Sequence, residues 1–324
     1  MTRISLEQIE KASRTIDPVF LNSPQFESET MGAELGMRLV LKVETVNPIR
    51  CFKGRGADFF VAGLPDDSPR LVCASAGNMG QGMAYAARQR GCALTVFAAE
   101  TANPLKVERM RQLGAEVKIA GGDFDAAKEH ARAFAEEQGA QFVEDGRETP
   151  LAEGAGSIAV ELCRWREPFD FLLVPLGDGA LLAGIGHWMK THSPSTRLIA
   201  ICAAGAAAMN LTLRSGMVQT IESAATIADG IAVRVPVPES LEHLAGIPDD
   251  ILLVEDEAMV QAMRLVFRHH GLVVEPSGVA GLAAAMVFRD RFRGAVVGTP
   301  LTGGNVTAEQ MEQWLLGKTF QPVE

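Results

Sequence analysis

Short apolar runs alternate with amphipathic stretches along much of the chain, and this alternation predicts the fold class. Short apolar runs are typical of buried strands, whereas apolar residues spaced three and four apart favour helices. Between residues 71 and 143 the pattern predicts alternating strands and helices: strands at 71–74, 93–98, 116–120 and 141–143, and helices at 82–90, 105–113 and 124–138. Such alternation is typical of a parallel sheet with helices on both faces.

The same pattern resumes after Pro150 and predicts a second sheet. The predicted helices are 153–164, 181–190, 256–269 and 278–288, and the predicted strands are 171–175, 198–202 and 295–297. We therefore expect an α/β protein with two open, mostly parallel sheets and a cleft between them. Glycine-bearing turns follow Ala74, Pro175 and Val297. Because ligands of open α/β sheets bind at the carboxyl ends of strands, these turns indicate a binding site.

Composition narrows the class of protein. The 324 residues include 30 Lys+Arg and 40 Asp+Glu, a formal net charge of -10, which argues against a nucleic-acid-binding surface. No segment has the roughly 18 uninterrupted apolar residues of a membrane span, and the amino terminus lacks a signal-peptide core. The five cysteines contain no CxxC pair and indicate reduced thiols. We expect a cytoplasmic protein that binds neither nucleic acid nor membrane.

The first candidate for chemistry is Lys53, within NPIRCFKGRGADFF. A lysine among small residues at a helix start can act as a covalent amine when its pKa is lowered. A second segment, residues 74–91, places Ser75, Gly77 and Asn78 between a buried strand and a helix, where backbone N–H groups can face an anion. Taken singly, these are also consistent with a solvated helix lysine and a serine-capped turn.

Three further segments have the same ambiguity when taken alone. Residues 174–186 form a glycine-spaced loop that leads into a helix, but they fit neither GxGxxG nor a P-loop. Residues 273–284 place Glu275 at a predicted strand end, and residues 301–306 place Thr302 before a Gly-Gly-Asn turn. The histidines and cysteines show no metal-ligand spacing.

Together the segments FKGRGA, SAGNMGQG, the glycine-spaced loop, EPSG and TGGN, in this order, resemble the fold-type II pyridoxal-phosphate enzymes of the tryptophan-synthase-β type. The chain is most similar to the threonine/serine dehydratases and serine racemases, from about residue 18 to about residue 307. The resemblance implies interleaved domains, with a large cofactor-binding domain of residues 1–66 and 154–324 and a small mobile domain of residues 67–153. It also implies pyridoxal 5'-phosphate in the cleft and a homodimer.

The resemblance implies roles for particular residues. Lys53 matches the Schiff-base lysine, which would also move the Cα proton, and Phe52 would lie against the cofactor. Asn78 would hydrogen-bond the ring oxygen of the cofactor, and Thr302 would face its pyridine nitrogen. The remaining cofactor-binding residues would be Gly177, Asp178, Gly179, Ala180 and Leu181 at the phosphate, together with Glu275. The substrate carboxylate would be held by Ser75, Ala76, Gly77, Asn78 and Met79.

Several residues depart from the pattern of the family. Ala76 occupies the position of the racemase serine, which disfavours racemisation, and Met79 stands where the dehydratases usually have histidine. Cys202 and Ala208 align with the acidic positions of the cation-dependent members, so we expect no metal. Asp178 introduces a negative charge into the phosphate loop. Arg50 is also unusual and could pair with Asp178 or receive a second substrate carboxylate.

The resemblance implies an ammonia-lyase that removes the β-hydroxyl of threonine, serine or a related amino acid and releases a 2-oxo acid and ammonia. A threonine synthase or β-replacement enzyme of the same fold is the main alternative. A racemase, or a lyase for a dicarboxylic or diamino substrate, is a further alternative. The sequence lacks the fingerprint of a nicotinamide oxidoreductase. The presence of Lys53, Asn78 and Thr302 argues against a binding protein without activity.

Overall fold

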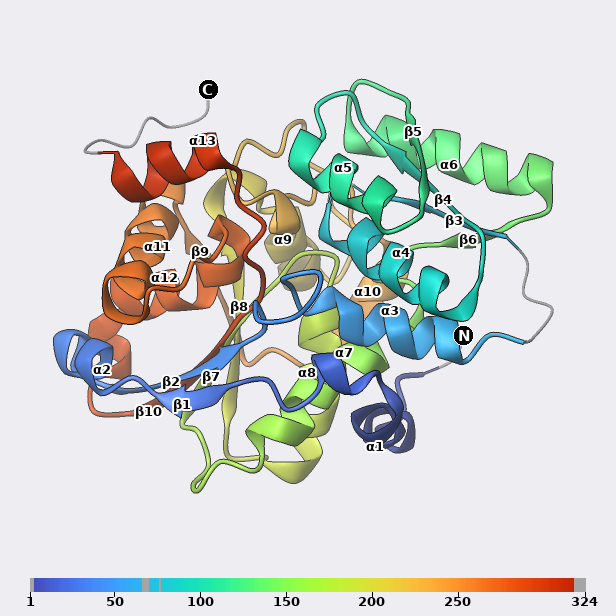
Figure 1. The fold of residues 1–324 in the computed structure, drawn as a ribbon. Helices are drawn as coiled ribbons and strands as arrows, with labels where there is room; N and C mark the ends of the chain where they lie inside the picture. The colour runs from blue at the N-terminus through green and yellow to red at the C-terminus, as the bar shows by residue number, and fades with distance from the viewer. Residues whose placement is uncertain (1–2, 66–69, 76, 318–324) are drawn as a thin grey trace.

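In the computed structural model, which describes residues 3–65, 70–75 and 77–317, ten strands form two separate sheets (Figure 1). The smaller sheet has the order β5-β4-β3-β6 and is parallel throughout. Its strands are β3 (Leu71–Ala74), β4 (Leu94–Ala98), β5 (Glu116–Ile119) and β6 (Gln141–Val143). All four lie inside the segment predicted as the small domain.

The larger sheet takes its strands from both ends of the chain. Its order is β1-β2-β10-β7-β8-β9, with only the β1–β2 pair antiparallel among the described strands. The strands are β1 (Gln25–Glu27), β2 (Arg38–Val43), β7 (Phe171–Pro175), β8 (Arg197–Ala203), β9 (Asp250–Val254) and β10 (Val296–Leu301). The prediction of two open, mostly parallel sheets is therefore confirmed.

Helices cover the sheets and fill the space between them, as parallel strands require crossover connections. They are α1 (Leu6–Thr15), α2 (Glu29–Leu35), α3 (Lys53–Ala62), α4 (Asn78–Arg90), α5 (Pro104–Gln112), α6 (Phe124–Gln138), α7 (Thr149–Leu162), α8 (Ala180–His192), α9 (Ala208–Ser215), α10 (Pro238–Leu244), α11 (Asp256–His270), α12 (Ala280–Val287) and α13 (Ala308–Gln310). None of the described helices is long and apolar enough to cross a membrane.

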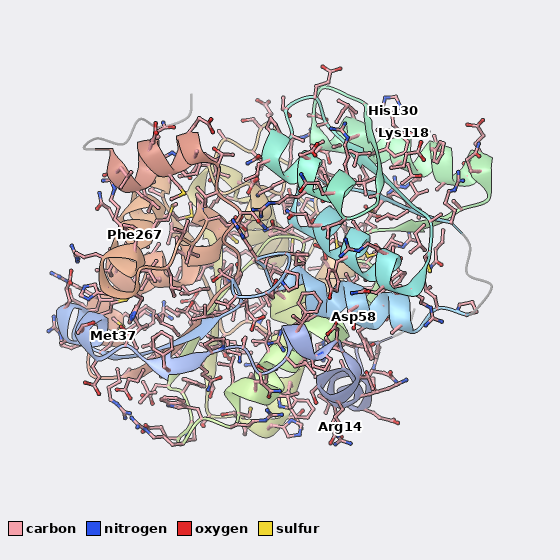
Figure 2. The ribbon with its side chains drawn as sticks, in the orientation of Figure 1. Arg14, Met37, Asp58, Lys118, His130 and Phe267 are labelled. Atoms are coloured by element: carbon pink, nitrogen blue, oxygen red, sulfur yellow. The ribbon has the colours of Figure 1, made fainter. Side chains whose placement is uncertain are left out.

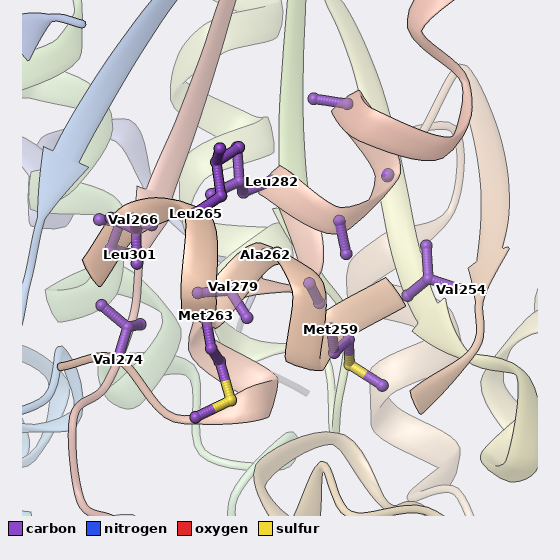
Figure 3. Packing of buried hydrophobic residues seen from close by; sticks show 14 of the residues in the cluster. Val254, Met259, Ala262, Met263, Leu265, Val266, Val274, Val279, Leu282 and Leu301 are labelled. Carbon is purple, nitrogen blue, oxygen red and sulfur yellow. The ribbon is translucent and has the colours of Figure 1, made fainter. Parts of the chain in front are cut away.

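The core of the larger sheet shows why these helices form where they do. Met259, Met263 and Val266 lie on one face of α11 and are fully buried. Figure 3 shows them close to residues of α12 and β10, including Leu282 and Leu301. Polar side chains such as Arg14 and His130 lie at the periphery of the molecule (Figure 2). The spacing of apolar residues thus places one face of α11 in the core of the larger sheet.

Several element boundaries differ from those predicted, including those of α4, α12 and β10. The helix predicted at 82–90 begins four residues earlier, at Asn78. Its glycines pack closely: a Cβ at Gly80 would lie 2.2 Å from Met110 Sδ. The helix predicted at 278–288 begins as a 3-10 turn at Pro276–Val279 before α12 starts. The strand predicted at 295–297 continues to Leu301, because it pairs with β2 along its whole length.

Candidate active site

Lys53 is the first residue of α3, and backbone pairing with the TGGN turn fixes its position. The Phe52 N–H donates to the Thr302 carbonyl at 3.0 Å, and the Gly304 N–H donates to the Arg50 carbonyl at 2.9 Å. Because this turn directly follows β10, the beginning of α3 lies at the carboxyl end of the larger sheet. Helix α3 itself packs against α4 and α7 (Figure 1).

A cavity of about 520 Å³ lies between the two sheets, where residues from several strand ends meet. Lys53 lines it together with residues that follow β3, β6 and β7. Of the predicted site residues, the cavity brings together Lys53, Ser75, Gly77, Asn78, Met79 and Asp178. Phe52 and Ala180 join Lys53 and Met79 around a smaller adjoining pocket. Ala76 lies outside the described residues.

The predicted phosphate loop presents a row of backbone donors. Among the described residues, no hydrogen bond engages the N–H groups of residues 177–181. Gly179 has φ +100°, in the left-handed region that favours glycine, and a Cβ at Gly177 would lie 2.8 Å from the Gly230 carbonyl. The loop leads directly into α8, whose dipole favours an anion at this end. This is a backbone cradle suited to a phosphate.

The start of α4 provides a second set of donors. Ser75 Oγ accepts hydrogen bonds from the Gly77 N–H at 3.0 Å and the Gly80 N–H at 2.8 Å. The N–H groups of Asn78 and Met79 have no acceptor within the described part of the chain. Ser75 therefore holds the turn in shape, and the two free N–H groups remain available to a carboxylate.

The Asn78 amide is oriented by neighbours from the carboxyl-terminal part of the chain. Asn305 Nδ2 donates to Asn78 Oδ1 at 2.9 Å, and Asn78 Nδ2 donates to Glu275 Oε1. The Asn305 N–H also donates to Glu275 Oε2 at 3.2 Å. Sequence reasoning missed Asn305, although it belongs to the TGGN motif.

Glu275 was expected at a strand end, and this prediction is wrong. It precedes a 3-10 turn that starts at Pro276, where the residue before proline is held extended. Its carboxyl group is buried and lies 3.5 Å from Lys106 Nζ. Burial raises the pKa of Glu275, while Lys106 acts in the opposite direction. Glu275 therefore orients Asn78 and neutralises a buried lysine.

Lys106 is a further residue that the sequence did not indicate. Its ammonium group is buried and lies 2.6 Å from Asp229 Oδ2. Burial opposes its charge, but the carboxylates of Glu275 and Asp229 raise the pKa of Lys106. This lysine on α5 thereby connects the smaller-sheet side of the cavity with the segment that follows β8.

Thr302 is 5 % exposed, and its hydroxyl forms no hydrogen bond within the described residues. Within the described part of the chain, this hydroxyl is therefore available to a ligand. Phe52 is half-buried, with its ring centroid 4.9 Å from Lys53 Nζ. Phe52 thus lies beside the lysine, and the hydrogen bond from the Phe52 N–H holds the Thr302 backbone next to Phe52.

Asp145 contacts Lys53, and sequence reasoning missed it. The Lys53 ammonium forms an ion pair with Asp145 Oδ2, and the Gly146 N–H donates to Asp145 Oδ1 at 3.1 Å. Asp145 follows β6 at the same sheet edge as Ser75 follows β3. The strand-end rule that singled out the other turns therefore applies equally to this residue.

Asp178 lines the cavity close to this ion pair. Within the described residues its carboxyl group has no hydrogen bond and no ion pair, with Arg50 or any other residue. Burial and the negative charge of Asp145 raise the pKa of Asp178 to about 7. Arg50 is exposed and does not line the cavity, so the predicted Arg50–Asp178 pair is wrong. The positive φ of Arg50, 54°, belongs to the turn that pairs with Gly304.

Comparison with known proteins identifies the family. The family model described as "Pyridoxal-phosphate dependent enzyme" matches residues 16–303. The chain belongs to this family. It is 30% identical over 312 residues to the L-threonine ammonia-lyase of Thermotoga maritima, covering 96% of this chain and 78% of that one. It is 31% identical over 316 residues to the L-threo-3-hydroxyaspartate ammonia-lyase of a Pseudomonas species, covering 97% of this chain and 99% of that one.

Some relatives are much longer. The chain spans only 47% of the chloroplastic biosynthetic threonine dehydratase of Arabidopsis thaliana, with 31% identity over 279 residues. Among solved structures, a threonine deaminase from T.th. has a TM-score of 0.87 and 32% identity, covering 94% of this chain and 99% of that one. Maize serine racemase has a TM-score of 0.89 and 27% identity, covering 96% of each chain.

The site fits the cofactor of the pyridoxal-phosphate-dependent family. Lys53 offers an amine to the aldehyde, the free N–H groups of residues 177–181 offer donors to the phosphate, and Thr302 offers a free hydroxyl to the ring. The described residues contain no group of three or more His, Cys, Asp or Glu side chains that could hold a metal ion. Cys202 and Ala208, which align with the cation site of other members, are both buried.

Proposed function

We propose that the protein is a pyridoxal-phosphate-dependent ammonia-lyase that removes the β-hydroxyl of serine, threonine or a related amino acid. The products are a 2-oxo acid and ammonia. The observation that carries this proposal is that Lys53 lines one cavity together with the free backbone donors at the start of α4 and with Asp178, which belongs to the loop of free donors that leads into α8. These donors suit the two anionic groups of the reaction, the cofactor phosphate and the substrate carboxylate.

The residues around the cavity would have different roles in the reaction. When bound, the cofactor supplies an electron sink for the charge that develops at Cα. Lys53 holds the cofactor and takes the Cα proton at Nζ, while the N–H groups of Asn78 and Met79 hold the substrate carboxylate. Thr302 would offer its hydroxyl to the cofactor ring, and a hydroxyl, unlike a carboxylate, would not keep a ring nitrogen charged. Such a ring would be a weaker electron sink, which suits a substrate with a β-leaving group.

The charge of the cavity supports a neutral hydroxy amino acid rather than a dicarboxylic one. Three cationic residues line it against seven acidic ones, among the residues that the structure describes: Lys53, Lys128 and Arg234 against Asp123, Asp125, Glu144, Asp145, Asp178, Glu222 and Asp229. A second substrate carboxylate would meet like charges here. The dicarboxylic amino acid in the name of the Pseudomonas relative is therefore not carried over to this chain.

The wider organisation is also part of the proposal. The division into residues 1–66 with 154–324 and residues 67–153 is supported by the smaller sheet, whose strands all lie between 71 and 143. A cytoplasmic location is proposed from the five cysteines, all of which are free thiols. A homodimer is proposed from the resemblance alone, and sedimentation of the purified protein tests it.

Spectroscopy and a product assay test the proposed function. We expect the cofactor-loaded protein to show visible imine absorbance that borohydride removes, and to release equal amounts of 2-oxo acid and ammonia from serine or threonine. Lys53→Ala should abolish the absorbance and the turnover, whereas Lys11→Ala, an exposed lysine of α1, should change neither. Product formation only in the presence of a second substrate would instead identify a β-replacement enzyme. Full turnover by Lys53→Ala would refute the proposal.

A further inference from the structure

Two carboxyl groups lie beside the reactive lysine, and they differ in how they are held. Asp145 is fixed from both sides, by the Gly146 N–H at Oδ1 and by the Lys53 ammonium at Oδ2. Both side chains of this ion pair are largely buried, with exposures of 18% for Lys53 and 14% for Asp145. Both carboxyl oxygens of Asp145 thus have a partner.

Asp178 is the contrasting carboxyl group. It projects into the same cavity from the loop after β7 and has no hydrogen-bond or ion-pair partner among the described residues. Its backbone lies against the β6 turn, since a Cβ on Gly146 would be 3.2 Å from Asp178 Cβ. From α10, the Ser240 hydroxyl donates to the Asp178 carbonyl, which fixes the backbone and leaves the carboxyl group free.

The charged groups around Asp178 come from three elements. Asp145 and Glu144 follow β6, Lys53 begins α3, and Lys128 lies on α6. Both lysines are already paired with carboxylates: Lys53 with Asp145, and Lys128 with Glu144 at 3.3 Å. Neither is therefore a dedicated partner for Asp178.

We propose that Asp178 is the acid that protonates the departing β-hydroxyl group, and that Asp145 positions Lys53 Nζ for the transfer of the Cα proton. The proposal rests on the proposed function, since it assigns the acid of that same elimination. It also accounts for an acidic residue in a loop that otherwise offers only backbone donors to an anion.

The protons and electrons of the step balance within the site. The Cα–H bond breaks and its proton moves to Lys53 Nζ, while its electron pair becomes the second bond between Cα and Cβ. The Cβ–O bond breaks and its electron pair leaves with oxygen, which takes the proton of the Asp178 carboxyl group and departs as water. Lys53 is then an ammonium group paired with Asp145, and Asp178 is a carboxylate. Return of the proton from Lys53 to Asp178, through Asp145 and cavity water, restores both groups.

The protonation of Asp178 near neutral pH supports this role. Burial and the neighbouring Asp145 raise the pKa of Asp178 to about 7, so a large share of the protein carries the proton at that pH. An acid is most effective when its pKa is near the working pH. A protonated Asp178 also removes a negative charge from the phosphate loop.

Two substrates with different leaving groups test the proposal. L-Serine loses hydroxide and needs an acid, whereas 3-chloro-L-alanine loses chloride and needs none. We expect Asp178→Asn to lower kcat/KM for serine by about 100-fold or more, the usual contribution of a general acid. The kcat/KM for chloroalanine should stay within about 5-fold of the wild-type value. Asp290→Asn, a matched change at an 82% exposed side chain, should alter neither value. Chloroalanine turnover also shows that the variant is folded and loaded.

A second readout is independent of turnover. In the cofactor-free protein, the infrared band of a protonated carboxyl group should titrate near neutral pH and be missing in Asp178→Asn. Asp145→Asn should lower kcat for both substrates and shift both pH profiles, because Lys53 serves both reactions, and Asp145→Glu should restore part of the loss.

The outcomes separate the two proposals. Loss of serine turnover alone supports Asp178 as the acid. Three outcomes overturn this assignment while leaving the lyase function intact. They are an equal loss of both activities in Asp178→Asn, no loss of either activity, and an infrared band that persists in this variant. Wild-type protein that converts neither substrate overturns the proposed function and, with it, the role of Asp178.

Discussion

Helix α3 presents two cationic side chains, two residues apart, to very different surroundings. Arg55 is fully buried and makes paired hydrogen bonds to two carboxylates: to Glu44 at 2.8 and 2.9 Å and to Glu161 at 2.7 and 3.1 Å. Lys42 joins the same group through Glu161. Two cations and two carboxylates thus balance in a closed network. Lys53 instead lies in an open cavity close to the carboxyl groups of Asp145 and Asp178, and of these two only Asp145 forms an ion pair among the described residues.

The difference shows how one helix can serve both stability and chemistry. A buried charge must be paired and hydrogen-bonded, and in the network around Arg55 the guanidinium and both carboxylates are engaged. In the cavity, Lys53 is paired with Asp145 and Lys128 with Glu144, so neither lysine forms an ion pair with Asp178. Because Asp178 has no such partner among the described residues, it can gain or lose a proton near neutral pH. The closed network around Arg55 holds α3 in place, whereas the carboxyl group of Asp178 beside Lys53 can change its charge.

The largest effect is expected from breaking the closed network. Arg55→Met leaves Glu44 and Glu161 buried with only Lys42 as a partner, so the free energy of unfolding should fall by about 3–5 kcal/mol. Urea unfolding followed by circular dichroism measures this change. Arg166→Met provides the matched control, since the Arg166 side chain is exposed where it pairs with Glu27. Its effect should stay within about 1 kcal/mol. Equal losses for the two variants would show that the network around Arg55 is not special.

An intermediate effect is expected from placing a second negative charge in the open cavity. L-Aspartate and L-asparagine have nearly the same shape, but only aspartate brings a carboxylate towards Asp145 and Asp178. As inhibitors of 3-chloroalanine turnover, asparagine should bind at least about 10-fold more tightly, equivalent to about 1.4 kcal/mol. Asp178→Asn should narrow this ratio, and Asp290→Asn should not. Preference for aspartate would instead indicate a site for dicarboxylic substrates.

The two regions also differ in what the sequence could predict. Strand and helix periodicity predicted most elements after residue 71, because most of these strands are short apolar runs with buried side chains. Before residue 66 only a helix beginning near Lys53 was expected, although β2 is an interior strand of the larger sheet. Strand β2 contains Arg38, which pairs with Glu27 of β1 and with Glu167, and Lys42, which pairs with Glu161 of α7. Its burial is therefore a property of the tertiary structure.

The site divides in the same way. Glycine-rich segments were recognisable because a backbone that approaches a ligand closely must lack a Cβ, and these segments supply Lys53, Asn78, Thr302 and the loop at 177–181. Asp145 and Lys106 are single charged residues without a local pattern. Their roles depend on contacts with Lys53, Asp229 and Glu275, which no spacing along the chain reveals. The turn expected at SAGNMGQG proved to be helical from Asn78 because its glycines pack against α3 and α5.

The smallest expected effect is the dependence of stability on the ionisation of the Asp178 carboxyl group. The pKa of Asp178 is raised to about 7 in the folded protein, whereas an unfolded aspartate has a value of about 3.9. Between these values the folded state binds more protons, so the stabilising contribution of Asp178 is complete at low pH and is lost as pH rises through about 7.

Asp178→Asn removes this contribution. From pH 5 to pH 8, the cofactor-free wild-type protein should lose at least about 1 kcal/mol more of its free energy of unfolding than the variant. Urea unfolding at a series of pH values measures the difference. Parallel curves would show that Asp178 is ionised throughout this range, and the contrast between the closed and open groups on α3 would then be one of exposure alone.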